Sequence, residues 1–323
     1  MLEDSFQLNE RAARLAERCE NEARRFNLAP HRVAGATVLD FGVEAAGGLA
    51  AGRELARICL SNLGDVRIEG GQLAGRVWPQ VTVQTDHPLH ACLLSQYAGW
   101  QIGIGKFFAL GSGPMRATAA VEPLFQEFGY REPCDFNGRY VGVLESGRLP
   151  NDEVVSWIAD KLAVTPSQIT LCVARTASLA GTVQVVARSV ETALHKLHEL
   201  KFDVRRIRSG FGTAPLPPVA ADDLTGIGLT NDAILYGGSV ALWVTGDDES
   251  IGAIGPQVPS SASAAHGEPF LKVFEQAGRD FYKIDPMLFS PAEITFCNLT
   301  TGKVQRFGEL AEDVLRRSFG IEL

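Results

Sequence analysis

Short apolar runs alternate along this chain with longer segments of helical periodicity, and this alternation constrains the fold more than any other feature. Runs typical of strands occupy residues 33–41, 140–144 and 169–174, and a segment of helical spacing follows each of them. Strands that alternate with helices are typical of α/β proteins with much parallel pairing. We therefore predict an α/β fold.

Other parts of the chain add expected elements of both kinds. Residues 76–85 alternate as in a strand, but Pro79 within them indicates an edge strand or a bulge. Residues 234–244 are expected to form a strand that Gly237 and Gly238 interrupt, and residues 293–319 follow the order strand, turn, strand, helix. Helices are expected at residues 1–26, 49–63 and 88–98, and a further helix is expected to begin after residue 114.

The length of 323 residues corresponds to about two domains, at about 150 residues per domain. We predict a first α/β domain at residues 1–145 and a second α/β domain at residues 146–323. The C-terminal strands either stay with the second domain or pack back on the first.

Composition and charge exclude several classes of protein. The chain has 38 acidic and 30 basic residues, a net charge of −8 and no basic run, so we expect no nucleic-acid partner. No segment approaches the roughly 18 consecutive apolar residues of a membrane span, and the charged N-terminus resembles neither a signal peptide nor a transit peptide. Six scattered cysteines without a C-x-x-C pair favour a reducing compartment. We therefore expect a cytoplasmic protein that does not bind membranes.

The segment 177–202 is expected to form one helix with two distinct stripes. Its apolar stripe consists of Val183, Val186, Val190, Leu194 and Leu197. A polar stripe lies about 120° around the axis and consists of Gln184, Arg188, Glu191, His195 and His198. The remaining arc, Ser189, Thr192, Lys196 and Glu199, is expected to face solvent. Either this helix lines a cleft, or it is a surface helix in which Arg188 and Glu191 form an ordinary i,i+3 ion pair.

The polar stripe also allows a metal site. Glu191, His195 and His198 are spaced so that they could share one ion, although the H-E-x-x-H arrangement is missing. A metal-dependent hydrolase that uses these three residues is therefore an alternative hypothesis.

Two other segments are candidates for ligand binding. Ser112, Gly113 and Arg116 belong to a glycine-rich turn that leads into a helix, so they form either an anion-binding cradle or a plain tight turn. Asn231 and Asp232 lie in an apolar neighbourhood, where they suit either ligand binding or helix capping. The G-x-G pairs of the chain do not continue as G-x-G-x-x-G, so a dinucleotide site is not indicated.

Five motifs in a fixed order resemble one known family. They are SQYAGW at 95–100, ALGSGP at 109–114, ARSVET at 187–192, TNDAILYGG at 230–238 and DFYK at 280–283. Together they resemble methenyltetrahydromethanopterin cyclohydrolase, an enzyme of one-carbon metabolism in methanogenic archaea and methylotrophic bacteria. The resemblance extends from about residue 5 to the C-terminus, and the moderate acidity is similar to that of bacterial, methylotroph members.

The resemblance implies a hydrolase that needs no metal and no redox cofactor. It implies that water opens the cationic methenyl bridge of N5,N10-methenyl-tetrahydromethanopterin and gives the N5-formyl compound. It further implies two α/β domains with a large pocket between them, a homotrimer, and a catalytic Arg and Glu that correspond to Arg188 and Glu191.

The expected chemistry agrees with these residue types. The carbon between two nitrogens shares a positive charge and is already electrophilic, so the enzyme has only to place a water and remove its proton. Glu191 is the expected general base, and Arg188 is expected to orient it. Gln96, Asn231 and Asp232 are candidates for hydrogen bonds to the pterin, and Tyr236 for stacking. The segment with Ser112, Gly113 and Arg116 is the candidate for anionic groups. A non-catalytic pterin- or phosphate-binding protein is the remaining alternative.

Overall fold

The computed structural model describes residues 6–135, 137–279 and 283–321, and it confirms the α/β class. The chain forms two compact units: unit 1 consists of Met1–Gly64 and His90–Gln184, and unit 2 of Asp65–Leu89 and Val185–Leu323. The predicted boundary at residue 145 does not coincide with this division. Residues 65–89 belong with the second half of the chain because β4 pairs with β9 there.

Unit 1 is built on a six-stranded mixed sheet with the order β1-β2-β8-β7-β6-β5. Strands β2, β8 and β7 pair in parallel, whereas β1 and the β5–β6 hairpin pair antiparallel. The strands are β1 (Ala29–Val33), β2 (Ala36–Gly42), β5 (Trp100–Ile104), β6 (Phe107–Ser112), β7 (Tyr140–Glu145) and β8 (Ile169–Ala174). The strand expected at 33–41 therefore begins at Ala36, and Pro30 lies in the edge strand β1.

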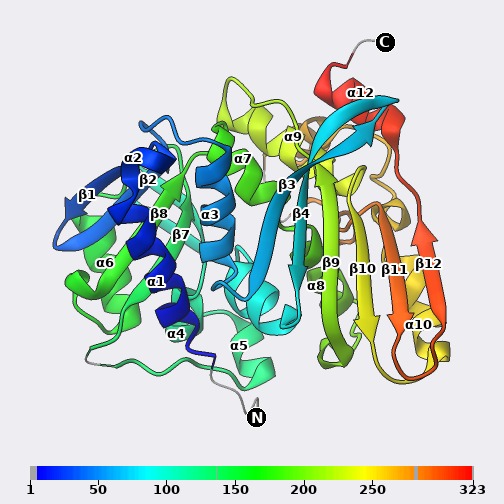
Figure 1. The fold of residues 1–323 in the computed structure, drawn as a ribbon, viewed down its shortest axis with the longest axis horizontal. Coiled ribbons are helices and arrows are strands. Elements are labelled where there is room, and N and C mark those ends of the chain that lie inside the picture. The colour runs from blue at the N-terminus through cyan, green and yellow to red at the C-terminus, as the bar shows by residue number, and fades with distance from the viewer. Residues whose placement is uncertain (1–5, 136, 280–282, 322–323) are drawn as a thin grey trace. The chain divides into compact units, whose positions relative to one another are not determined.

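Helices cover both faces of this sheet, as Figure 1 shows. Helices α1 and α3 pack on one face, and α4 and α6 contribute to the core on the other. The helices of unit 1 are α1 (Leu8–Asn21), α2 (Ala23–Phe26), α3 (Leu49–Cys59), the π-helix Leu89–Gln96, α4 (Met115–Ala119), α5 (Pro123–Phe128), α6 (Asp152–Leu162) and α7 (Leu179–Val186), and the division between the units falls within α7.

Unit 2 is built on a second six-stranded sheet with the order β12-β11-β10-β9-β4-β3. Strands β10 and β11 pair in parallel, whereas β9 pairs antiparallel with both β10 and β4, and β12 pairs antiparallel with β11. The strands are β3 (Gly64–Leu73), β4 (Arg76–Thr85), β9 (Ile207–Pro215), β10 (Ser239–Val244), β11 (Glu293–Asn298) and β12 (Val304–Gly308).

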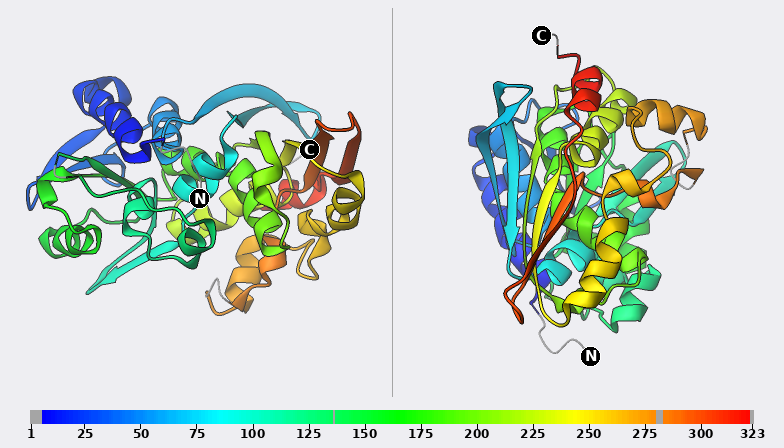
Figure 2. Two further views of the ribbon diagram at one scale, coloured as in Figure 1. Left: turned by 90° about the horizontal axis from the view of Figure 1, so that it is seen from below. Right: turned by 90° about the vertical axis from the view of Figure 1, so that its right-hand side faces the viewer.

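The helices of unit 2 gather on one face of its sheet, as the right-hand view of Figure 2 shows. Helix α8 packs against β4, β9 and β10, whereas α11 and α12 pack on α9. These helices are α8 (Ser189–Glu199), α9 (Asp223–Leu235), α10 (Asp248–Ile254), α11 (Phe270–Gln276) and α12 (Glu312–Phe319). No helix within the described ranges is both long and apolar enough to cross a membrane.

Two expectations about unit 2 are wrong. The apolar run at 234–244 is not one strand, because α9 continues to Leu235 and β10 begins only at Ser239, after Gly238. Of the two alternatives for residues 76–85, an edge strand or a bulge, the edge strand is wrong, because β4 lies between β9 and β3. Pro79 is tolerated there because the pairing with β9 starts at Gln80, and the Pro79 carbonyl accepts a hydrogen bond from the Leu216 N–H.

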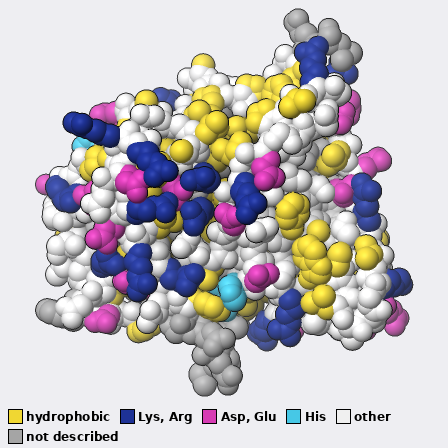
Figure 3. All heavy atoms as spheres, in the orientation of Figure 1, with side chains coloured by type: hydrophobic (Ala, Val, Ile, Leu, Met, Phe, Trp, Pro, Cys, Tyr) yellow, Lys and Arg dark blue, Asp and Glu magenta, His cyan; other side chains and the backbone are white. Residues whose placement is uncertain are grey.

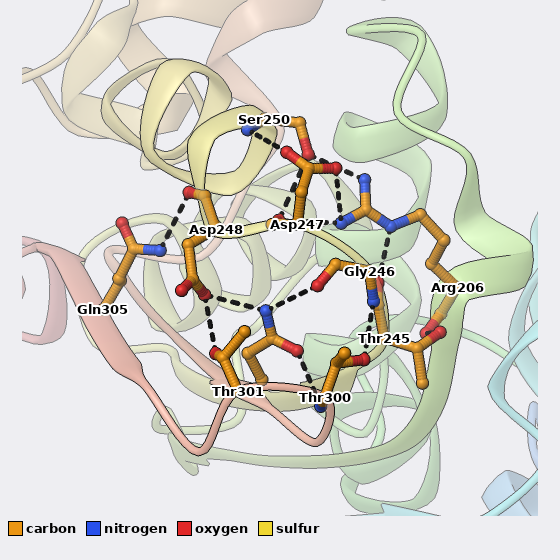
Figure 4. Close-up of polar contacts among 10 residues, drawn as sticks. Arg206, Thr245, Gly246, Asp247, Asp248, Ser250, Thr300, Thr301 and Gln305 are labelled. Carbon is orange, nitrogen blue, oxygen red and sulfur yellow. Dashed lines mark hydrogen bonds and ion pairs between the residues drawn. The ribbon is translucent and has the colours of Figure 1, made fainter.

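A polar network joins the loops at one end of the unit 2 sheet (Figure 4). Arg206 donates to the Thr245 carbonyl at 2.6 Å and to the Ser250 hydroxyl at 2.8 Å. Asp248 accepts hydrogen bonds from Asn298, the last residue of β11, and from Thr301 in the turn between β11 and β12. The C-terminal order strand, turn, strand, helix is confirmed.

Candidate active site

Arg188 and Glu191 lie where the expected helix is divided into two. Helix α7 ends at Val186, and Arg188, with φ −92° and ψ 9°, precedes the first turn of α8. The Arg188 carbonyl accepts hydrogen bonds from the N–H and the hydroxyl of Thr192, both at 2.8 Å. These bonds hold the backbone that carries the two charged side chains.

The two side chains form a buried ion pair. Arg188 and Glu191 are each 6% exposed, and Nη1 of Arg188 lies 4.0 Å from Oε2 of Glu191. This separation is longer than a hydrogen bond, so across these two atoms the guanidinium stabilises the carboxylate through its electric field. The first turn of α8 also favours a negative charge at Glu191. The pair carries no net charge, which lets a cation approach it without repulsion.

Two glycines of β9 allow α8 to lie close to the sheet. A Cβ atom at Gly212 would lie 2.5 Å from the Ser189 hydroxyl, and a Cβ atom at Gly210 would lie 2.7 Å from a methyl group of Val190. Ser189 and Val190 separate Arg188 from Glu191 in the chain. Gly210 and Gly212 of β9 therefore determine how close to the sheet the turn with the ion pair lies.

The rest of the expected polar stripe is divided. Gln184 lies on α7 and donates to Glu145 at 3.0 Å. His195 is half-buried, burial lowers its pKa, and its Nε2 lies 3.9 Å from the Glu199 carboxylate. Within the described ranges no three His, Cys, Asp or Glu side chains are grouped so that they could hold a metal ion. The alternative site of Glu191, His195 and His198 is therefore not formed.

The arc expected to face solvent is largely covered. Ser189 and Lys196 are fully buried and Thr192 is half-buried, whereas Glu199 is exposed as expected. The Lys196 ammonium donates to the Met287 carbonyl, and burial lowers its pKa to about 8. Sequence periodicity missed this amine because it shows the spacing of side chains along a helix and not what a distant segment places over them.

Four candidate residues of unit 1 lie together around the end of the π-helix. Gln96 is its last residue, and the Ser95 carbonyl beside it accepts hydrogen bonds from Gly113 N–H at 2.9 Å and from Arg116 at 3.1 Å. The Ser112 hydroxyl lies 3.2 Å from the Cys59 sulfur, which in turn contacts the Gln96 carbonyl. Gly113 has φ +84°, so its lack of a side chain is required by the backbone.

Arg116 is engaged within unit 1. It is fully buried, its guanidinium forms an ion pair with Glu122, and it also donates to the Leu93 carbonyl at 3.2 Å. Its charge lies over the rings of Tyr97 and Phe125, 5.1 and 5.3 Å from their centroids. The hydrogen bonds from Arg116 cap carbonyl groups of the π-helix. Arg116 itself lies in α4, a helix of only five residues. A role of Arg116 in anion binding stays a prediction.

The candidates of unit 2 lie on and after α9. Asn231 is half-buried and donates to the Ile227 carbonyl at 2.8 Å. Asp232 is buried and accepts hydrogen bonds from the Phe270 N–H at 2.8 Å and the Ser318 hydroxyl at 2.5 Å, and burial raises its pKa to about 7. The buried Tyr236 hydroxyl donates to the Glu268 carbonyl at 2.5 Å. Burial raises the Tyr236 pKa to about 12.

A cavity of about 660 Å³ opens in unit 2. Its walls include Ser261, His266, Asp313 and Arg317, and none of the nine candidate residues lines it. Of the DFYK motif, residues 280–282 lie outside the described residues.

Comparisons with known proteins cover almost the whole chain. The model of the cyclohydrolase (MCH) family matches residues 7–319. A protein of Rhodopirellula baltica is 48% identical over 294 residues, which are 90% of this chain and 88% of that protein. Relatives from Methylobacillus flagellatus and Methanospirillum hungatei are 46% and 43% identical, over 88% and 97% of this chain and 86% and 98% of theirs. All three are named methenyltetrahydromethanopterin cyclohydrolase. The chain therefore belongs to the cyclohydrolase (MCH) family.

Proposed function

We propose that this protein is a methenyltetrahydromethanopterin cyclohydrolase in which Glu191 is the general base and Arg188 orients it. The observation that carries the proposal is the family match over residues 7–319 together with an intact, buried Arg-x-x-Glu at the start of α8. The substrate is N5,N10-methenyl-tetrahydromethanopterin and the product is its N5-formyl derivative.

The reaction requires little beyond placement of a water. The water oxygen forms a bond to the cationic methenyl carbon, and Glu191 takes one of its protons as that bond forms. The new hydroxyl group then loses its proton as the bond from this carbon to N10 breaks, N10 takes up one proton, and the formyl group stays on N5. One proton is released overall, because the substrate cation becomes a neutral amide.

The neutral Arg188–Glu191 pair suits a cationic substrate. An isolated buried guanidinium would repel the methenyl cation, whereas its partner carboxylate cancels that repulsion. A guanidinium close to a carboxylate favours its charged form, and a carboxylate is a weak base. A weak base is sufficient here because the substrate carbon already carries positive charge.

The experiment is the Glu191→Gln variant, followed by the loss of the methenyl-pterin absorbance without added metal. We expect kcat to fall by about 10²–10⁴-fold, because the proton acceptor is removed, and KM to change little. Glu199→Gln is the matched control, because Glu199 lies on the same helix and is exposed. A near wild-type rate for Glu191→Gln would remove the assignment.

We propose the remaining candidate residues as substrate contacts. Gln96, Asn231 and Asp232 offer polar groups for the pterin, Tyr236 an aromatic ring, and the turn of Ser112, Gly113 and Arg116 a place for anionic groups. We further propose that the enzyme works in the cytoplasm as a homotrimer without a cofactor. Full activity after exhaustive chelation would support metal-independent hydrolysis, and loss of activity that a metal restores would contradict it.

A further inference from the structure

Three arginines of unit 1 converge on one buried carboxylate. Glu54 of α3 is fully buried, and it accepts hydrogen bonds from Arg18 at 2.6 Å, from Arg53 at 2.7 and 3.1 Å, and from Arg57 at 3.3 Å. The arginine side chains are 45%, 42% and 25% exposed, so solvent reaches all three. Lys and Arg side chains gather over α1 and α3 in Figure 3. We call these four residues the Arg18 cluster.

One carboxylate cannot neutralise three guanidinium groups, so the Arg18 cluster carries a net charge of +2. The neighbouring acids of the N-terminal helices are already paired with other arginines: Glu10 with Arg14 and Arg139, Glu17 with Arg139, Glu20 with Arg32, and Glu22 with Arg25. Like charges held within hydrogen-bond distance of a single carboxylate repel one another. The cluster therefore keeps a local positive charge on a chain whose net charge is −8.

The cluster also holds a buried donor with no acceptor. Nε of Arg57 is buried and makes no hydrogen bond among the described residues, while Nη2 of the same side chain donates to Asn62 at 2.9 Å. Arg11 extends the positive surface, since it donates to the Ser61 and Asn62 carbonyls just after α3 at 3.3 and 3.0 Å. A buried donor that lacks an acceptor costs free energy, so the cluster is not fully satisfied by its own residues.

We propose that the Arg18 cluster binds a multivalent oxyanion, a phosphate or pyrophosphate group on a small molecule. Guanidinium groups present paired N–H donors that match the oxygens of phosphate. In the cluster, Arg18 and Arg53 have more exposed side chains than Arg57. Two negative charges on the ligand would balance the surplus of the cluster. Glu54 acts as the fixed support that keeps the three guanidinium groups together in the absence of the ligand.

The test uses pyrophosphate as the probe, with calorimetry and thermal unfolding at constant ionic strength. Arg18→Ala/Arg53→Ala removes two exposed guanidinium groups and leaves Arg57 to pair with the buried Glu54. The control is Arg14→Ala/Arg25→Ala, because these arginines are 73% and 71% exposed and lie outside the cluster. We expect saturable binding to the wild type and the control, and at least tenfold weaker binding to the first variant.

Equal binding to all three proteins, or a stabilisation that sodium chloride reproduces at the same ionic strength, would mean an adventitious ion only and would overturn the proposal. If the double variant fails to fold, Arg53→Ala alone gives the same comparison, since it leaves two of the three ion pairs to Glu54. Binding is measured without turnover, so the result does not depend on the proposed cyclohydrolase activity.

Kinetics identify the source of the oxyanion. If pyrophosphate competes with the pterin substrate and Arg18→Ala/Arg53→Ala raises KM, the group belongs to the substrate. If pyrophosphate binds but changes the KM of the wild type no more than Arg18→Ala/Arg53→Ala does, and neither change is measurable, the site takes a separate ligand. Both outcomes require that the Arg18 cluster binds pyrophosphate. Absence of pyrophosphate binding overturns the proposal.

Discussion

Asp232 joins three helices through one carboxyl group. It lies on α9, accepts a hydrogen bond from Phe270 at the first residue of α11, and accepts another from Ser318 on α12. Burial disfavours the charged form and raises the pKa to about 7 from an ordinary value of 3.8. The packing of unit 2 therefore depends on the protonation of a group that would be ionised in water.

This shift predicts how stability changes with pH. Because the folded pKa lies above the unfolded one, the contribution of Asp232 is fully present below about pH 3.8 and is lost as pH rises to about 7. Asp232→Asn keeps the acceptor for Phe270 and cannot ionise. This variant should show a flatter dependence of the free energy of unfolding on pH. Between pH 4 and pH 8 its free energy of unfolding should rise by about 2–4 kcal/mol relative to wild type.

Urea unfolding at several pH values measures this difference. Asp160→Asn is the control, because Asp160 is an exposed carboxylate at the end of α6. The same slope in Asp232→Asn and wild type would contradict the role given to the Asp232 carboxyl.

Arg116 is expected to be a major contributor to the stability of unit 1. Arg116→Ala leaves the carboxylate of Glu122 buried without its cation and the carbonyls of Leu93 and Ser95 without a donor. Removal of one partner from a buried pair costs about 3–5 kcal/mol, and the free energy of unfolding should fall by that amount. Arg131→Ala, at an exposed arginine of the same region, is the control. A loss below about 1 kcal/mol would show that the pair is dispensable, and KM of Arg116→Lys tests the anion-binding prediction separately.

At the scale of elements, the close approach of α8 to β9 is the feature that positions Arg188 and Glu191, the proposed catalytic pair. Gly212→Ala would force the first turn of α8 away from the sheet, because the added methyl group overlaps Ser189 and Val190. A displacement of about 1 Å at a reacting group can cost about 10²-fold, so we expect kcat to fall by about 10- to 100-fold while the fold persists.

Gly103→Ala is the matched control for this prediction. Gly103 also lies in a strand, β5, and an added Cβ atom would meet nothing within 4 Å. Steady-state kinetics and circular dichroism of both variants decide the point. Equal kcat values for Gly212→Ala and Gly103→Ala would mean that the distance between α8 and the sheet does not matter for catalysis.

The sequence predicts elements well where one pattern decides their structure. The strands at β7 and β8 and the C-terminal β11, β12 and α12 are confirmed because apolar periodicity and turn residues agree there. The division of α7 from α8 is not visible, since apolar spacing continues unbroken through residues 187–188. Strand β9 was missed for a related reason, because its glycines serve packing against α8 and do not follow strand propensity.

The candidate site shows the same limit. The Arg-x-x-Glu spacing and the family motifs give Arg188 and Glu191 as candidates, because both signals are local in sequence, and the catalytic role of the two residues stays a prediction. The burial of Lys196 and Arg116 depends on segments far along the chain, Met287 for one and the π-helix for the other. Such contacts arise from tertiary packing, which single-sequence patterns do not contain.

At the scale of the whole molecule, the family resemblance predicts a defined assembly. Light scattering after gel filtration should give about three times the chain mass of 34.8 kDa, because the resemblance implies a homotrimer. The mass should persist on dilution into the concentration range of the activity assay. A mass of one chain in that range, with full activity, would contradict the prediction.

The interleaving of the two units has a consequence for the order in which the protein is made. Residues 65–89 leave the ribosome early, but Gln80 of β4 must wait for Pro215 of β9, with the whole of residues 90–184 translated in between. During that interval β4 lacks its partner on one side, and an unpaired strand is prone to the wrong association. Unit 1 can complete its sheet first, since β8 ends at Ala174. We therefore expect unit 1 to fold during synthesis and unit 2 to be completed only after the chain is released.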